Sequence, residues 1–276
     1  MDYNLTKENR KEYSDNRVNH MKKKRIVIDI LIVIIPIILC VGGYYIYNQY
    51  IKEPGIPSVN QLIKEKEESG YQDKEENQID VTTYVNQLPS LRSQYGNQDI
   101  MGKIEIPNLN IDALVVRSND NVYYLNNSIY KQKDGLGVPF FDFRNTNLNT
   151  NRQINIYGHN TLKEEYYDQL PFTNLEAYVN KNIFLNYRDV YLSIDERQMH
   201  YEVVAIKIIT VGDNEHMKVT FKNDSDFIQH INRMVQGSIY TNDASFTAND
   251  RVLVLQICHY EPMGSYLLVI CKEKHE

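Results

Sequence analysis

Residues 252–260 read Val-Leu-Val-Leu-Gln-Ile-Cys-His-Tyr, and residues 154–160 read Ile-Asn-Ile-Tyr-Gly-His-Asn. Both stretches are mostly apolar and contain β-branched residues, which predicts two buried strands. Cys258 ends the one strand and His159 follows the other. A thiol and an imidazole that meet at strand ends are the minimum for a cysteine nucleophile, because a nearby imidazolium helps the thiol to ionise. A buried, inert cysteine and a structural histidine are the alternative interpretation.

An uncharged apolar stretch at residues 30–51 follows the basic run Lys-Lys-Lys-Arg at 22–25. About 20 apolar residues suffice to cross a bilayer, and basic residues remain on the cytoplasmic side. The pattern predicts a cytoplasmic tail at 1–25, a transmembrane anchor at 26–51 and an extracellular remainder. A cleaved signal peptide is the alternative, but it would have a shorter apolar core and a small-residue cleavage site. The tyrosines at the end of the stretch favour a retained anchor.

The charge of the chain is unevenly distributed. Its formal net charge is −6, whereas the first 25 residues are basic, so the predicted extracellular part is acidic. An acidic domain lacks the basic surface with which proteins bind phosphate backbones. The sequence therefore argues against a nucleic-acid partner.

The chain has three cysteines, of which Cys40 lies in the predicted anchor. Cys258 and Cys271 fall on consecutive predicted strands that a short turn joins. In an antiparallel hairpin Tyr266 would lie near the position opposite Cys258, which puts the two cysteines roughly 17 Å apart along the strand. That separation is too large for a disulfide, so Cys258 is predicted to be a free thiol. We find no metal-ligand spacing and no phosphate-binding glycine loop, and expect no cofactor.

Residues 52–80 are polar and highly charged, which predicts a stalk, and residues 81–276 are predicted to form one domain. A helix is predicted over 224–236, where an apolar stripe follows a cap at Asp224 or Ser225. The shorter predicted elements are helices at 81–95 and 174–179, and strands at 103–107, 112–116, 137–143, 153–158, 182–186, 189–194, 199–210, 251–258 and 266–272. Many short strands with few helices favour a closed or sandwiched, mainly β architecture.

Several motifs follow one another along the predicted domain. They are Gly-Lys-Ile-Glu-Ile-Pro at 102–107, Asn-Ile-Asp at 110–112, Asn-Val-Tyr-Tyr-Leu-Asn at 121–126, Phe-Phe-Asp-Phe-Arg-Asn at 140–145, Tyr-Gly-His-Asn at 157–160, and residues 255–260. In this order the domain resembles class B sortases, the membrane-anchored cysteine transpeptidases of Gram-positive bacteria. The resemblance implies an eight-stranded sortase β-barrel with short helices, and the helix at 224–236 is similar to the extra helix of class B.

The resemblance also implies a reaction. In the family, the cysteine attacks a threonine carbonyl in the sorting signal of an exported protein, and an amine of the cell-wall peptide resolves the thioester. The implied catalytic residues are Cys258 and His159, with His159 as general acid and base. The implied partners are a sorting-signal peptide, a peptidoglycan stem-peptide amine and the membrane. Asn121, Leu125, Ile257 and His259 are the predicted residues of the peptide groove.

The sequence departs from the family where an arginine on the strand after the cysteine is expected. That position falls on Ser265 or Tyr266, and neither carries a charge. A tetrahedral oxyanion needs hydrogen-bond donors, so Tyr266 and Ser265 are the predicted substitutes, and Arg144 and His259 are further candidates. Three interpretations stay open: a working transpeptidase or hydrolase, a degenerate sortase domain that binds a peptide or wall component with little turnover, and a membrane-tethered receptor with an incidental cysteine.

Overall fold

The computed structural model describes residues 59–70 and 85–274. Contacts divide the chain into two units, residues 1–55 and residues 56–276, and every described residue belongs to the second. The predicted cytoplasmic tail at 1–25 and anchor at 26–51 lie outside the described residues. Each helix of the described part is too short or too polar to cross a bilayer.

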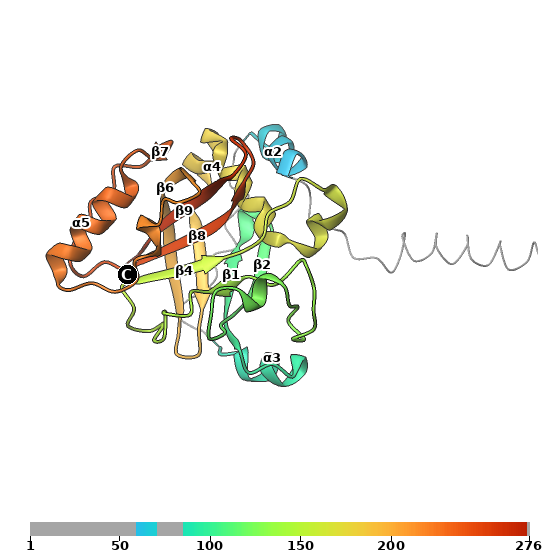
Figure 1. The fold of residues 1–276 in the computed structure, drawn as a ribbon. Coiled ribbons are helices and arrows are strands. Elements are labelled where there is room, and N and C mark those ends of the chain that lie inside the picture. The colour runs from blue at the N-terminus through green and yellow to red at the C-terminus, as the bar shows by residue number, and fades with distance from the viewer. Residues whose placement is uncertain (1–58, 71–84, 275–276) are drawn as a thin grey trace, which may run out of the picture. The chain divides into compact units, whose positions relative to one another are not determined.

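The second unit is built on a closed β-barrel (Figure 1). Its strands are β1 (Ile100–Ile106), β2 (Ile111–Val116), β3 (Phe140–Phe141), β4 (Gln153–Tyr157), β5 (Asp189–Ser193), β6 (Gln198–Thr210), β8 (Val252–His259) and β9 (Ser265–Glu273). They pair in the order β5-β1-β2-β3-β4-β8-β9-β6, and an antiparallel pairing of β5 with β6 closes the ring. The short strand β7 (Tyr240–Thr241) is added to the free side of β6. The predicted eight-stranded barrel is therefore confirmed.

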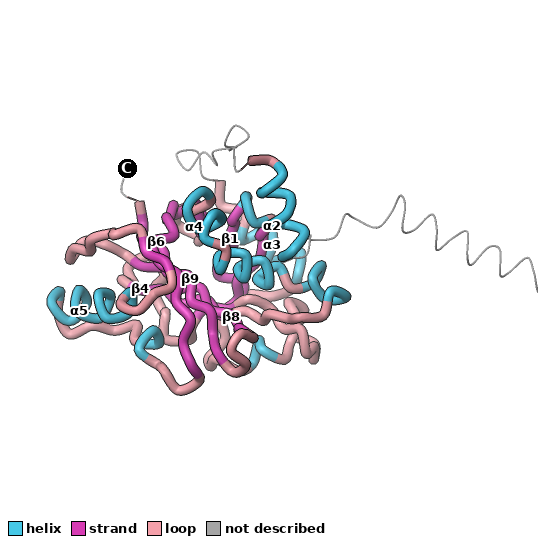
Figure 2. Tube along the Cα trace, turned by 90° about the horizontal axis from the view of Figure 1, so that it is seen from above, coloured by secondary structure: helices cyan, strands magenta, loops and turns pink. Residues whose placement is uncertain are grey.

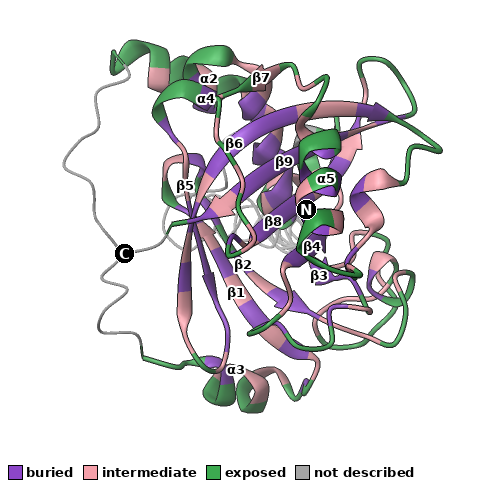
Figure 3. Ribbon diagram, turned by 90° about the vertical axis from the view of Figure 1, so that its left-hand side faces the viewer, coloured by how far each residue is buried: buried purple, intermediate pink, exposed green. Residues whose placement is uncertain are grey.

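Strand β8 is buried on both of its faces, which explains its nearly continuous apolar sequence. Leu253, Leu255 and Ile257 point into the core that fills the barrel. Val252 and Val254 belong to a second core on the outer face of β8 and β9. Figure 3 shows how far the buried residues extend along the strands.

Helix α5 (Asp224–Val235) covers this outer face of the barrel (Figures 1 and 2). The predicted apolar stripe is confirmed, because Phe227, Ile231 and Met234 are buried against β8 and β9. The predicted cap is wrong. Asn223 precedes the helix in extended conformation and accepts a hydrogen bond from the backbone nitrogen of Asp226, which is the geometry of an N-cap.

The remaining helices are short. They are α2 (Val59–Glu68), α3 (Leu88–Tyr95), α4 (Lys181–Asn186), and the 3-10 helices η3 (Pro107–Leu109), η4 (Tyr123–Leu125), η5 (Glu164–Gln169), η6 (Pro171–Val179) and η7 (Glu215–Met217). The predicted strand at 182–186 is wrong, because Asn180 caps a helix there by accepting from the nitrogens of Asn182 and Ile183. The strand predicted at 137–143 shrinks to two residues.

Helix α2 lies within the segment predicted as a stalk. Its Leu62 is fully buried in the main core, and Val59 and Ile63 pack against that core. Residues 59–68 are consequently part of the folded domain, because their apolar side is buried by it rather than exposed on a linker.

Candidate active site

Parallel pairing of β4 with β8 brings the ends of both strands to one edge of the barrel. Tyr157 pairs with Gln256, so His159 and Cys258, each two residues further along, come to the same edge. Both line a cavity of about 410 Å³. Of the other predicted site residues, Asn121, Leu125, Ile257 and Tyr266 also line this cavity.

The imidazole of His159 is held by the carbonyl oxygen of Leu125, which lies 2.8 Å from Nε2. A carbonyl oxygen can only accept, so Nε2 carries the hydrogen and the neutral ring offers its Nδ1 as the base. Leu125 was predicted as a groove residue, and its backbone supplies this second role. This hydrogen bond joins η4 to a residue just after the end of β4. No local sequence motif predicts it, because the two residues are 34 positions apart in the chain.

Gly158 precedes His159 for a reason that the sequence does not reveal. A Cβ atom at this position would lie 2.4 Å from Cδ2 of Phe172, so the Phe172 ring packs directly on the backbone. The close approach of η6 is therefore the reason for a glycine at this position. The glycine allows the core to reach the backbone immediately beside the catalytic candidate.

The thiol of Cys258 is free and half-buried. Burial raises its pKa above the ordinary value of a cysteine, which favours the neutral thiol at neutral pH. Among the hydrogen bonds of the described residues, none joins this thiol to His159. A buried neutral thiol needs a base when it attacks a carbonyl carbon. His159 lines the same cavity and is the candidate for that base, through its Nδ1 atom.

The register of the β8–β9 hairpin separates the two predicted substitutes for the arginine. Tyr266 lies directly opposite Cys258, so both side chains project from the same face, and Tyr266 lines the cavity. Ser265 is buried and is not part of the cavity wall. Its hydroxyl donates to the carbonyl oxygens of Pro262 and His259, at 2.6 and 3.3 Å, which excludes it as the predicted donor.

His259 also differs from its prediction as a groove residue. It is buried, it does not line the cavity, and its Nδ1 lies 2.6 Å from Oε1 of Glu176. Burial raises the pKa of Glu176 even though the neighbouring His259 opposes the shift. The amide of Asn160 donates to Glu176 and to the carbonyl oxygen of Cys258, at 3.1 and 2.8 Å. The contacts among Asn160, Glu176 and His259 thus hold the backbone at the end of β8 in place.

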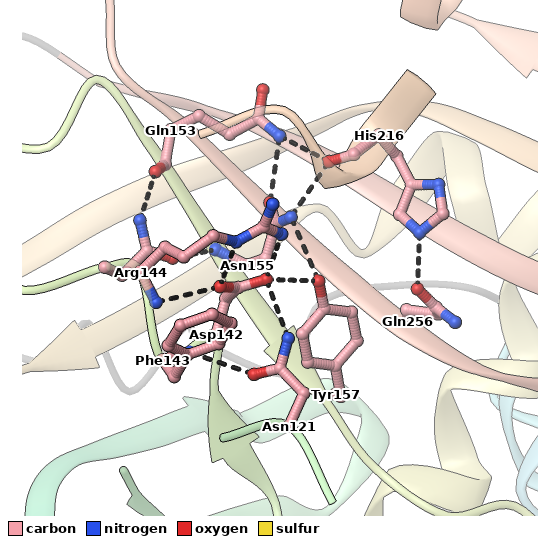
Figure 4. Close-up of polar contacts among 10 residues, drawn as sticks. Asn121, Asp142, Phe143, Arg144, Gln153, Asn155, Tyr157, His216 and Gln256 are labelled. Carbon is pink, nitrogen blue, oxygen red and sulfur yellow. Dashed lines mark hydrogen bonds and ion pairs between the residues drawn. The ribbon is translucent and has the colours of Figure 1, made fainter. Parts of the chain in front are cut away.

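Two residues of the cavity wall, Asn121 and Tyr157, belong to a polar network (Figure 4). At its centre, Asp142 accepts from the guanidinium of Arg144 at 2.8 and 2.6 Å, from the Tyr157 hydroxyl and from the Asn121 amide. Burial alone would raise the pKa of Asp142, but Arg144 and the other donors hold it below its ordinary value. Arg144 is committed to this ion pair and does not line the cavity, so it does not replace the missing arginine. Asn121 is positioned here by the same network.

Among the polar residues of the cavity wall that the sequence did not indicate, His216 and Gln256 contact each other. Nε2 of His216, on η7, lies 2.6 Å from Oε1 of Gln256, on β8 (Figure 4). The two are distant in the chain and meet only because the segment between β6 and α5 covers the outer face of β8. No sequence motif could have indicated the pair.

A closed mixed β-barrel that places a histidine and a cysteine on one cavity at its edge has the architecture of a sortase. Sortase B of Listeria monocytogenes is 29% identical over 166 residues, which are 60% of this chain and 65% of that protein. Sortase B of Staphylococcus aureus is 25% identical over 254 residues, 91% of this chain and 97% of that protein.

The crystal structure of Clostridium perfringens sortase B superposes with a TM-score of 0.61 and 28% identity, over 68% of this chain and 99% of that one. No family model matches the sequence. In fold and in sequence the chain is similar to class B sortases. The predicted resemblance is thereby confirmed. The aligned segment spans slightly less than two thirds of the Listeria protein.

Proposed function

We propose that the protein is a cysteine transpeptidase that cleaves the sorting signal of exported proteins through a thioester on Cys258. The observation that carries the proposal is the shared cavity of Cys258 and His159 at the parallel ends of β8 and β4. A nucleophile and a base at one cavity wall are the geometry that acyl transfer requires.

The chemistry follows from the residues on the cavity wall. The Cys258 sulfur attacks the peptide carbonyl carbon while the thiol proton passes to Nδ1 of His159. The resulting oxyanion collapses to a thioester, and His159 returns the proton to the departing amine. A second amine then attacks the thioester, loses its proton to His159 and regenerates the thiol. With water as the acceptor the same steps give hydrolysis.

The family suggests the physiological partners. The acyl donor is a sorting-signal peptide, and the acceptor is an amine of the peptidoglycan stem peptide. The predicted anchor at 26–51 holds the chain in the cell membrane with its N-terminus in the cytoplasm, so that the barrel meets these partners outside the cell.

A second function is favoured by one observation. No lysine or arginine is among the residues that line the cavity of the described domain, so an oxyanion receives no charged donor there. Neutral hydrogen bonds are roughly half as strong as charge-assisted ones. The alternative is a domain that binds a sorting peptide or a wall component with little or no turnover.

Mass spectrometry of the intact protein after incubation with a library of sorting-signal peptides separates the two functions. A transpeptidase forms a thioester adduct on Cys258 that disappears when an amine is added. The adduct is absent in Cys258→Ala and greatly reduced in His159→Ala. Peptide binding without any adduct would exclude the transpeptidase and leave the binding domain.

A further inference from the structure

The His216–Gln256 pair is a polar pair of the cavity wall that the proposed reaction does not yet use. Gln256 stands two residues before Cys258 on β8, so both side chains project from the same face of the strand. That separation is roughly 7 Å between Cα atoms, which a glutamine side chain can bridge toward the reacting carbon. Gln256 is half-buried and lines the cavity together with Cys258.

Hydrogen-bond chemistry fixes the orientation of the pair. Oε1 of Gln256 can only accept, so Nε2 of His216 must carry the hydrogen of their 2.6 Å contact. The carboxamide oxygen is thereby held toward η7, and its NH2 group is left for another partner. Among the described residues, no group accepts a hydrogen bond from that NH2.

The ring of His216 leaves one buried nitrogen without a hydrogen bond, which lowers the stability of the fold. The residue is 3% exposed, and its Nδ1 has no partner among the described residues. Leaving a buried polar atom unpaired costs about 1–3 kcal/mol. Burial also lowers the pKa of His216, which keeps the ring neutral and its single hydrogen on Nε2.

The segment that carries His216 is held on two sides. Its backbone carbonyl accepts from the amides of Gln153 and Asn155, at 2.7 and 2.9 Å (Figure 4). The adjacent Glu215 binds Arg233 and His230 of α5, at 2.9 and 3.1 Å. The ring is thus set in place before any ligand binds, which is the requirement for a preorganised donor.

We propose that the Gln256 amide is the oxyanion donor of the Cys258 site and that His216 is the positioning residue that turns the amide toward the cavity. The pair supplies a neutral hydrogen bond in a chain whose cavity lacks a cationic side chain. The inference rests on the proposed acyl transfer and names the group that stabilises its tetrahedral intermediate.

The proposal can be tested with two reagents that share the nucleophile but differ in their transition states. With p-nitrophenyl acetate, the Cys258 sulfur adds to the carbonyl carbon, an oxyanion forms, and its collapse expels p-nitrophenolate and leaves an acetyl thioester. With iodoacetamide, the same sulfur displaces iodide from a saturated carbon and no oxyanion forms. Rates on Cys258 are followed by peptide mapping of the full-length chain in detergent.

Gln256→Met removes the amide at nearly constant size, and His216→Phe removes its orienting donor. Each is expected to slow acetylation of Cys258 by about tenfold or more, with no change in the alkylation rate. His216→Gln, which can donate from the place of Nε2, should restore most of the acetylation rate. The double variant should be no slower than Gln256→Met alone, because His216 acts through Gln256.

Gln229→Met is the matched control, because it removes the same amide from the exposed side of α5, where it bonds only Ser225. Its two rates should equal those of the parent. Equal losses of acetylation and alkylation in Gln256→Met would overturn the proposal, as would unchanged acetylation or a slowing confined to Tyr266→Phe. A parent Cys258 that is alkylated but never acetylated would overturn it as well. Normal acetylation without any peptide adduct would instead contradict the transpeptidase and leave this donor standing.

Discussion

Gly158 shows how one residue position constrains the candidate active site. The Phe172 ring of η6 occupies the space that a side chain at 158 would need. Because the next residue is His159, any displacement of the backbone at 158 also moves the imidazole relative to the Leu125 carbonyl. Packing of the core and placement of the base are thus decided at the same point of the chain.

Gly158→Ala is therefore expected to reduce both stability and thioester formation. Overpacking of this kind costs typically about 1–3 kcal/mol, measured as the free energy of unfolding in denaturant. Gly135→Ala is the control, since no atom lies within 4 Å of the Cβ position there. An alanine at 158 with parental stability and parental acylation would show that Phe172 moves aside freely.

The raised pKa of Cys258 leads to a second prediction at this scale. Because only the thiolate is alkylated, the rate with iodoacetamide should be low at neutral pH and keep rising beyond about pH 9, the ordinary titration range of a thiol. Cys271 is fully buried and should not react in the folded domain. A rate that already levels off near pH 7 would mean that a cation, such as protonated His159, stabilises the thiolate.

At the scale of elements, helix α2 extends the folded domain to the N-terminal side of residue 81, where the sequence predicted its start. Leu62→Ala should lower the free energy of unfolding by about 2–5 kcal/mol, the usual range for a fully buried leucine. Glu68→Gln, which breaks an exposed ion pair with Lys64 in the same helix, should cost less than about 1 kcal/mol. Equal and small effects would mean that α2 is not docked in solution. A fragment that starts at residue 81 would lack this helix and should be less stable than one that starts at residue 57.

The element scale also shows which features a sequence pattern can predict. Long strands with one or two buried faces, such as β6 and β8, were recognisable from their apolar residues. The run at 182–186 was not, because a short apolar stretch fits a buried helix as well as a strand. The choice between Ser265 and Tyr266 required the exact hairpin register. The His216–Gln256 pair joins η7 to β8, and only the packing of α5 on the barrel creates that contact.

For the whole molecule, the open prediction concerns its orientation in the membrane. The basic run at 22–25 should keep the N-terminus inside the cell and expose residues 52–276 on the outer surface. Protease added to intact, wall-stripped cells should digest the barrel and leave a small protected N-terminal fragment. Lysed cells, in which both sides are accessible, provide the control. A barrel that resists digestion until lysis would reverse the orientation.

One continuous segment, residues 211–236, connects β6 to the end of α5 and contributes Val211, Gly212, Asn214, His216 and Met217 to the cavity wall. The thiol and the imidazole come from the barrel instead. Replacement of this segment would therefore exchange one side of the cavity and leave Cys258 on β8 and His159 just after β4. Ligand selectivity can therefore diverge, or be engineered, in a segment that takes no part in the pairing that closes the barrel, as long as His216 is kept for its proposed role beside Gln256.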